Sequence, residues 1–325
     1  DTQEGVNTVV MPCGPAPDLL LLKLAHMTME NPGNICFANA TTSALLWTTL
    51  STMKWSLKAW GKQCQMLHDF ICTSPDTCKN LCVEVWFQQI LHCWGMIDPA
   101  TSPQRVAQQD SAEFVAAWLE QMDSDAFDMR WEKRILEDNH IRVCDQGCKS
   151  TPICLKFPQF LADFSCSDLT NLFDVWRQVD GMCTALCQAP TCLCIHVDRY
   201  AQDEKQQIYK SECMLQTDQV CLVPVFKDDA LTCEMIEYQV VALTAHLGLD
   251  TAGHFRSALR LAPAITNQVT PAEWLLTDDW VTPKPLWDVP NWMKRTATVY
   301  WLTRSDEVKL WKYRNMDTKP DADRK

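Results

Sequence analysis

The chain has 325 residues, of which 47% are hydrophobic and 22% are charged, a composition typical of a globular protein with a sizeable core. Its formal net charge is −12, which argues against nucleic acid as a partner, because nucleic-acid binders present a basic surface. No apolar run approaches the ~20 residues of a membrane span, and residues 19–22 are too short for a secretory signal, so no membrane association is expected. The 18 cysteines are spread along the whole chain, which predicts reduced thiols and a cytoplasmic or nuclear location.

Residues 1–27 are predicted to be an N-terminal approach segment. A Pro-rich loop occupies residues 11–17, and residues 18–27 form a short helix or strand. Residues 36–98 contain many Trp and few Gly or Pro, and their pattern is mainly helical. The large apolar side chains of this region are most simply core residues.

A cysteine stands between a turn and a helix near the start of this region. Residues 31–34, Asn-Pro-Gly-Asn, predict a turn, and residues 37–50 form an apolar run without Gly or Pro, which predicts a helix. Cys36 is therefore expected at a helix N-terminus, where exposed N–H groups and the helix dipole stabilise a thiolate. The side-chain amide of Asn31 is placed to donate to a developing oxyanion. Taken alone, a cysteine in this position is more often structural than catalytic.

A second helix is predicted to begin after residues 108–110, Gln-Gln-Asp. Asp110 is a good N-cap, and Glu113 takes the third helical position, as in a capping box. Apolar residues between 114 and 122 then recur on one helical face.

The second half of the chain has the alternating pattern of β-structure. Residues 192–200, 221–226 and 238–245 are predicted strands, and residues 201–211 are a loop or hairpin. A further strand begins at Gly253 after a loop, and glycine at this point suggests close approach of another backbone.

The histidine of this last strand is the best candidate for a general base. A cysteine nucleophile needs an imidazole to take its proton and a carboxylate to orient that imidazole. His254 follows Gly253 directly, and two consecutive carboxylates follow at Asp278 and Asp279. Without further context, such an acidic pair is usually a turn, and His246 and His196 are expected to be structural.

Taken in order, these motifs resemble the boxes of the ubiquitin-specific proteases, the papain-like peptidases that remove ubiquitin. The cysteine box matches at six positions: Asn31, Gly33, Asn34, Cys36, Phe37 and Asn39. The later boxes match at Gln108-Gln109-Asp110, at Arg199-Tyr200, at Tyr238 through Gly253-His254, and at Trp274 through Asp278-Asp279. The chain departs from the family where Ala112 replaces a frequent His, Asp198 replaces Lys, and Thr277 replaces an aromatic residue.

The resemblance implies a role for each matching residue. It implies Cys36 as nucleophile, His254 as general base and Asp278 as its orienting carboxylate. Asn31 would donate to the oxyanion, and Asp279 would assist. It further implies contacts with the substrate from Gln109, Asp110, Gly253 and Phe255.

The fold implied is an α+β papain-like fold in the right-hand architecture of the family. The catalytic domain would span residues 28–315 and be followed by a polar tail at residues 316–325. Its parts would be a helical thumb at about 28–140, reduced fingers at about 141–189 and a β-rich palm at about 190–305.

The family's fingers commonly hold a zinc ion between two cysteine pairs. The corresponding pairs would be Cys144 with Cys148, and Cys183 with Cys187, and four thiolates suit a tetrahedral structural site. Three residues separate the cysteines of each pair where two are usual, so buried free thiols are the alternative. Catalysis needs no cofactor.

The activity implied is hydrolysis of the isopeptide or peptide bond after the ubiquitin C-terminus, with ubiquitin or a ubiquitin conjugate as partner. Two alternatives stay open. The shortened fingers are compatible with a protease for a ubiquitin-like modifier, and a scaffold that binds without cleaving is the third interpretation. The sequence does not indicate the oligomeric state.

Overall fold

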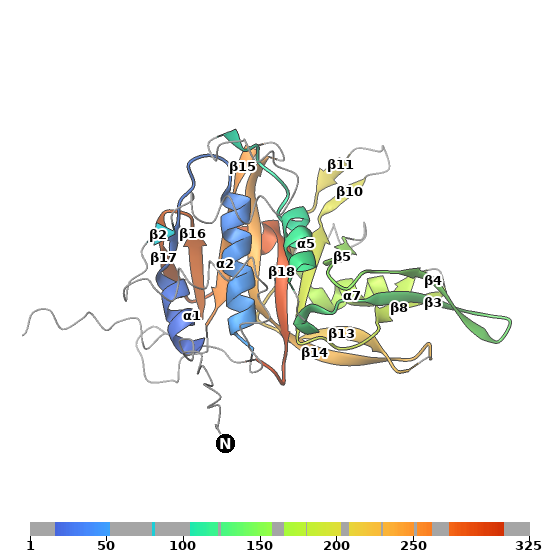
Figure 1. Ribbon diagram of the computed structural model, residues 1–325. Coiled ribbons are helices and arrows are strands. Elements are labelled where there is room, and N and C mark those ends of the chain that lie inside the picture. The colour runs from blue at the N-terminus through green and yellow to red at the C-terminus, as the bar shows by residue number, and fades with distance from the viewer. Residues whose placement is uncertain are drawn as a thin grey trace, which may run out of the picture.

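A computed structural model describes ten segments of the chain, and every structural statement below refers to them: residues 17–52, 80–81, 105–122, 125–157, 166–179, 181–202, 208–228, 230–249, 252–261 and 273–308. Figure 1 shows one helix standing against a large curved sheet, with a β-hairpin projecting to one side. None of the helices within these segments is long and apolar enough to cross a bilayer.

Short helices surround one long central helix. They are α1 (Pro17–His26), α2 (Cys36–Leu50), α5 (Ser111–Gln121), the 3-10 turn η3 (Asp125–Phe127), α7 (Leu169–Arg177) and α8 (Asn291–Thr296). The predicted helix at residues 37–50 is confirmed as α2, and residues 18–27 form a helix rather than a strand. The rest of the mainly helical prediction for residues 36–98 falls largely outside the described segments.

Twelve strands form the large sheet. They are β3 (Trp131–Glu137), β4 (His140–Gln146), β5 (Ile153–Lys156), β7 (Gln178–Val179), β8 (Met182–Leu186), β9 (Cys192–Asp198), β13 (Cys221–Phe226), β14 (Cys233–Leu249), β15 (Ala252–Arg260), β16 (Trp274–Asp278), β17 (Val281–Leu286) and β18 (Ala297–Arg304). Its main path runs β17-β16-β15-β14-β13-β8-β3-β4, and β18 joins β14 to β9.

Three separate two-stranded sheets complete the β-structure. They pair β1 (Thr28–Met29) with β2 (Asn80–Leu81), β6 (Cys166–Asp168) with β12 (Met214–Gln216), and β10 (Tyr200–Gln202) with β11 (Ile208–Lys210). The last pair confirms a hairpin within residues 201–211, and the predicted strands at 192–200, 221–226 and 238–245 lie in β9, β13 and β14.

Helix α2 is part of the core on almost every side. Fourteen of its 15 residues are buried, because it packs on β14 and β15 and is flanked by α1 and α5. Its buried polar side chains are mainly threonines, and Thr48 and Thr49 donate to carbonyls within the helix. Ser257 of β15 donates to the carbonyl of Ala40 at 2.6 Å, and Phe37 meets Phe114 of α5 edge to face at 5.6 Å. These contacts fix both the position and the rotation of α2.

The projecting hairpin in Figure 1 consists of β3 and β4. Its turn is formed by Asp138 and Asn139, both with positive φ, as a tight two-residue hairpin turn requires. The predicted boundary between a helical thumb and the fingers, residue 140, lies in this hairpin. Residues 131–137 form strand β3 and not the end of a helical region. In the sequence, the consecutive residues Asp138 and Asn139 indicate the hairpin turn that follows this strand. The other domain boundaries stay predictions.

A buried arginine that is bound by backbone carbonyls stabilises the palm. Arg199, which is 1% exposed, follows β9, and its guanidinium donates to four backbone carbonyls. The acceptors are Ala297 at 2.7 Å, Cys213 at 2.8 Å, Lys294 at 2.9 Å and Ser211 at 3.4 Å. Only the planar fork of arginine has enough donors for this set.

We predict that Arg199→Lys lowers the free energy of unfolding by about 2 to 4 kcal/mol, because an ammonium cannot reach these carbonyls and leaves buried acceptors unpaired. Chemical denaturation followed by tryptophan fluorescence would measure the change. The matched control is Arg142→Lys in the exposed hairpin, where Arg142 pairs with Glu137 at 2.7 Å and a loss below about 0.5 kcal/mol is expected. Equal effects of the two substitutions would contradict this account of Arg199.

Candidate active site

Cys36 is the first residue of α2 and is 3% exposed. The residue before it, Ile35, is the N-cap and has no side-chain cap to offer, so the helix start depends on the preceding loop. Asn31 supplies part of this support, because its Oδ1 accepts from the Ile35 N–H at 3.1 Å. The sulfur thus lies at the positive end of a helix whose direction the core determines.

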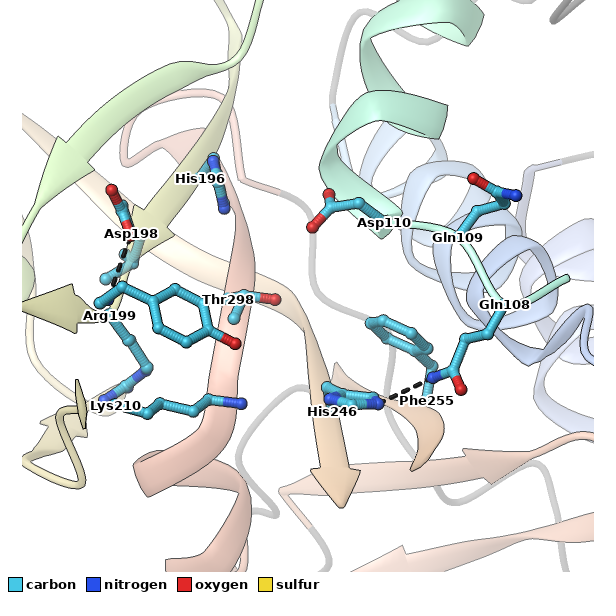
Figure 2. Close-up of a pocket in the computed structure, with 12 residues that line it drawn as sticks. Gln108, Gln109, Asp110, His196, Asp198, Arg199, Lys210, His246, Phe255 and Thr298 are labelled. Carbon is cyan, nitrogen blue, oxygen red and sulfur yellow. Dashed lines mark hydrogen bonds between the residues drawn. The ribbon is translucent and has the colours of Figure 1, made fainter. Parts of the chain in front are cut away.

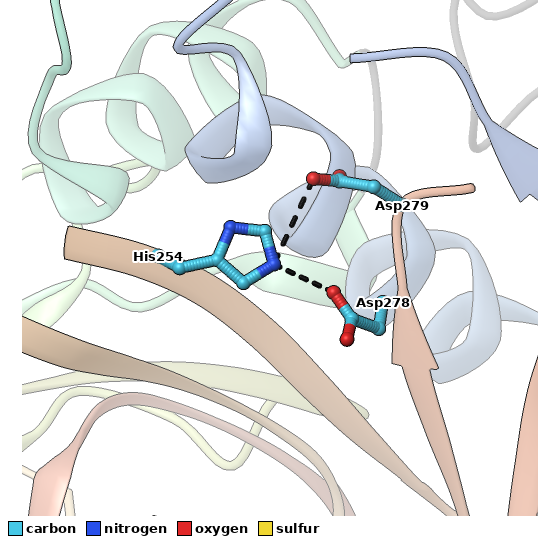
Figure 3. Close-up of side chains that lie close together, drawn as sticks. All are labelled: His254, Asp278 and Asp279. Carbon is cyan, nitrogen blue, oxygen red and sulfur yellow. Dashed lines mark hydrogen bonds and ion pairs between the residues drawn. The ribbon is translucent and has the colours of Figure 1, made fainter. Parts of the chain in front are cut away.

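His254 lies on β15 and is bound by the carboxylate at the end of β16. Its Nε2 is 2.6 Å from Asp278 Oδ1 (Figure 3). The other carboxylate oxygen of Asp278 is 2.9 Å from Nε of Arg256, two residues further along β15. Asp278 is therefore held between two cationic partners on neighbouring positions of one strand face.

The environment of His254 favours the imidazolium. A hydrogen bond with Cys36 is the largest cause that raises the pKa of His254, to about 9, and the hydrogen bond with Asp278 and the charge of Asp279 act in the same direction. Partial burial opposes them. Since Nε2 faces Asp278, the other ring nitrogen, Nδ1, is the one available to the thiol. The three side chains predicted as a triad thus come together in space, from residues 36, 254 and 278.

Asp279 connects the acidic pair to the cysteine segment. Its Oδ2 accepts from Asn31 Nδ2 and its Oδ1 from Asn39 Nδ2, both at 2.7 Å, and its carbonyl accepts from Met29 N–H at 2.9 Å. Burial raises the pKa of Asp279, and the two amides counteract that shift. Its Oδ2 is 3.8 Å from His254 Nε2, so it faces the ring without replacing Asp278 (Figure 3).

The oxyanion role predicted for Asn31 is compatible with this geometry. An amide nitrogen carries two hydrogens, and the bond to Asp279 uses one of them. The same bond fixes the direction of the second. Asn31 is thus oriented by Asp279 and by the Ile35 N–H, on the side of Cys36 that precedes the helix.

A pocket of about 430 Å³ opens between the start of α5 and the strands β9, β10 and β14. Figure 2 shows Gln109 and Asp110 on one wall, and His196 and Asp198 on the opposite wall. Three of the four predicted substrate contacts line it, Gln109, Asp110 and Phe255. Asp110 also caps α5, because its Oδ1 accepts from the N–H of Ala112 at 2.6 Å, which confirms the predicted N-cap.

The fourth predicted contact, Gly253, does not line this pocket, but it is hydrogen-bonded to Gln108, which does. The Gln108 Oε1 accepts from Gly253 N–H at 3.0 Å, and its Nε2 is 2.8 Å from His246 Nε2 (Figure 2). A Cβ at residue 253 would collide with the His246 ring, so the close approach requires glycine. His246 in turn packs against Phe255 with ring centroids 4.5 Å apart.

Sequence reasoning missed three residues that support the site: Gln108, Asn39 and Arg256. Gln108 belongs to the Gln-Gln-Asp motif, and its side chain connects the residues before α5 to His246 of β14 and Gly253 of β15. Asn39 lies three residues after Cys36, one helical turn along, and could have been placed on the same face as the thiol. Arg256 stands two residues from His254, and strand periodicity puts both on one face.

The four predicted zinc ligands are not gathered into one group within the described segments. Cys144 is the extra residue where the β3–β4 register shifts, while Cys183 is paired with Arg134 on the opposite side of β3. Cys183 instead meets Cys233, with their sulfurs 3.4 Å apart. Within the described segments, the only group of three or more metal-type ligand atoms with suitable spacing is His254, Asp278 and Asp279. Zinc binding by Cys144, Cys148, Cys183 and Cys187 stays a prediction.

The mixed arrangement of helices around a curled sheet agrees with the predicted α+β fold. The profile of the ubiquitin carboxyl-terminal hydrolase family matches residues 27–285. Most of the sequence is covered by this match, and the chain belongs to that family. The resemblance to ubiquitin-specific proteases is thereby confirmed.

Solved structures agree with this assignment at the level of the fold. The SAGA Ubp8/Sgf11/Sus1/Sgf73 DUB module bound to ubiquitin aldehyde matches with a TM-score of 0.57 and 12% identity, over 87% of this chain and 70% of the other. A variant module bound to monoubiquitin matches at 0.55 and 11%, over 92% and 72%. The yeast module with an altered Sgf73 matches at 0.54 and 12%, over 87% and 69%. No curated protein matches in a sequence comparison.

We predict that Asp278→Asn lowers the pKa of His254 below the value of about 9, because the amide keeps a hydrogen-bonding group but removes the negative charge beside the ring. An NMR titration of the His254 ring would measure it. Asp306→Asn is the control, since Asp306 pairs with Arg304 at the far end of β14 and should leave the titration unchanged. An unchanged pKa in Asp278→Asn would contradict the orienting role.

Proposed function

We propose that this chain is a deubiquitinating cysteine protease that hydrolyses the isopeptide or peptide bond after the ubiquitin C-terminus. The observation that carries the proposal is the position of the His254 ring between the thiol of Cys36 and the carboxylate of Asp278. Membership of the ubiquitin carboxyl-terminal hydrolase family supports the choice of ubiquitin. The solved relatives bound to ubiquitin aldehyde or monoubiquitin support it further.

The first half of the reaction forms a thioester. The Cys36 thiolate attacks the carbonyl carbon, and the carbonyl oxygen becomes an oxyanion next to the Asn31 amide and the N–H groups at the start of α2. His254, protonated at neutral pH because its pKa is raised to about 9, gives its proton to the departing amine as the carbon–nitrogen bond breaks. Asp278 keeps the imidazole in the orientation that this transfer needs.

The second half releases the carboxylate. His254, now neutral, takes a proton from water while the water oxygen attacks the thioester carbon. The tetrahedral intermediate collapses, the carbon–sulfur bond breaks, and Cys36 leaves as the thiolate while His254 keeps the proton taken from water, which restores the starting thiolate–imidazolium pair. No cofactor is needed for either half.

The pocket beside the triad suits an extended tail that leads to the scissile bond. It continues from the polar walls at Asp110 and Asp198 to Phe255, the neighbour of His254 on β15. Carboxylates at Asp110 and Asp198 and the ammonium of Lys210 give the pocket both signs of charge, which suits a polar tail. Gln108 holds the N–H of Gly253 in the absence of substrate, which keeps this edge of β15 in place.

The nucleophile is tested with a ubiquitin that carries a C-terminal electrophile. We predict that the wild-type chain forms one covalent adduct under reducing conditions, visible as a mass shift, and that Cys36→Ala abolishes it. Cys144→Ala, which removes an exposed thiol of the hairpin, should be labelled like wild type. No adduct with wild type, or adducts that persist in Cys36→Ala, would contradict the proposal. Reaction confined to probes made from ubiquitin-like modifiers would assign the alternative substrate.

The pH dependence of kcat/KM tests the role of His254. A pKa raised from 6.5 to about 9 means that the imidazolium persists through neutral pH and is lost as the pH rises through 9. We therefore predict that kcat/KM for a ubiquitin substrate falls on the alkaline side with an apparent pKa near 9. An alkaline fall near 6.5 would show that His254 has an ordinary pKa and that the thiol contact is absent.

A further inference from the structure

Two large apolar side chains stand exposed on the turn that follows the catalytic carboxylates. Trp280 is 54% exposed and Val281, the first residue of β17, is 58% exposed. Isolated apolar side chains on a surface are common and need no explanation. Two of them on consecutive residues, at the rim of an active site, form a small apolar surface that a substrate must pass.

The Trp280 ring is held in place. Its Nε1 donates to the carbonyl of Asn31 at 3.3 Å, the same residue whose amide is oriented by Asp279. Asp279, directly before it, has a φ of 38°, which is unfavourable outside glycine and is maintained by its bonds to Asn31, Asn39 and Met29. The indole is therefore a fixed surface, ordered at little further entropic cost on binding.

The order of strands places this surface across the triad from the pocket. His254 is on β15. On one side of it lie β14, β18 and β9, whose residues line the pocket, and on the other side lies the β16–β17 hairpin with Trp280 at its turn. A tail that fills the pocket and delivers its carbonyl to Cys36 has its leaving group directed toward Trp280.

We propose that Trp280, with Val281, is the binding site for the leaving group, and that it holds the aliphatic stem of the lysine whose side chain is joined to the ubiquitin C-terminus. This inference rests on the proposed function and adds a specificity-determining residue to it. In an isopeptide the lysine nitrogen is an uncharged amide, so four methylene groups lead away from the scissile bond. A flat indole face with an apolar neighbour matches such a stem.

The contact acts on one side of the scissile bond only, which makes it separable from catalysis. Two ubiquitin substrates are needed, identical up to the scissile carbonyl. One is ubiquitin ethyl ester, whose leaving group is too small to reach Trp280. The other is ubiquitin joined to the lysine side chain of a short fluorescent peptide. The ratio of their kcat/KM values reports the leaving-group site alone, because the acyl half and the triad are shared.

We expect Trp280→Ala to lower kcat/KM for the isopeptide substrate about tenfold, the order expected from losing contact with about two methylene groups, and to change that for the ester less than about twofold. Trp280→Phe keeps an apolar ring but removes the N–H donor to Asn31, so it should retain most of the isopeptide activity. Trp287→Ala is the matched control. Trp287 is 62% exposed but follows the last residue of β17, roughly 20 Å from Val281 for an extended chain, and it should behave like wild type with both substrates.

The possible outcomes distinguish this inference from the proposed function on which it rests. Equal losses on both substrates in Trp280→Ala, shared by Trp280→Phe, would mean that the indole acts only by holding Asn31 and would overturn the leaving-group assignment. Wild-type rates on both substrates in Trp280→Ala would overturn it as well. A wild-type chain that cleaves neither substrate would instead contradict the proposed function and remove the inference with it.

Discussion

The site depends on one imidazole held between a sulfur and a carboxylate that are more than 200 residues apart in the sequence. The His254 ring is hydrogen-bonded to Cys36 and, through Nε2, to Asp278. Neither contact survives a small rotation of α2 or a change of register between β15 and β16, because a one-residue slip would turn His254 to the other face of the sheet. The burial of α2 on nearly every side prevents the first, and the paired register of Ser257 with Thr277 prevents the second.

The buried carboxylate of Asp279 joins the two halves of this arrangement. A carboxylate taken out of water is costly unless donors surround it, and both of its side-chain donors, Asn31 and Asn39, come from the cysteine segment. The strained turn after β16 and the loop before α2 therefore stabilise each other. The residue that binds Asn31 is thus not the residue that binds the His254 ring most closely, although the two are neighbours in sequence. Asp278 contacts His254, and Asp279 contacts Asn31. A single carboxylate could not make both sets of contacts.

The parts of the site that the sequence predicts are those with local signals. A turn before an apolar helix placed Cys36, a capping pattern placed Asp110, and a glycine before a strand placed His254. The hairpin at β3 and β4, the bridge made by Gln108 and the distribution of the finger thiols depend instead on which strands become neighbours. Cys183 meets Cys233 although 50 residues separate them in the sequence, and no spacing along the chain reveals that contact. Family motifs supplied candidates for these long-range contacts, but only geometry decides among them.

The surroundings of the triad are asymmetric, and this follows from the strand order. On the side of β14 and β9 the surface is a polar pocket with a carboxylate on each wall, and on the side of β16 and β17 it is small, apolar and rigid. Charged, hydrated walls suit a long segment that is recognised by its side chains, whereas a flat aromatic surface suits a short contact that must also be released after cleavage. A fixed indole does not need to move when the bound lysine amide is converted into the released amine. Under the proposed function, the order of strands sets the direction of the substrate, since exchanging the two sides would require a different order of strands around β15.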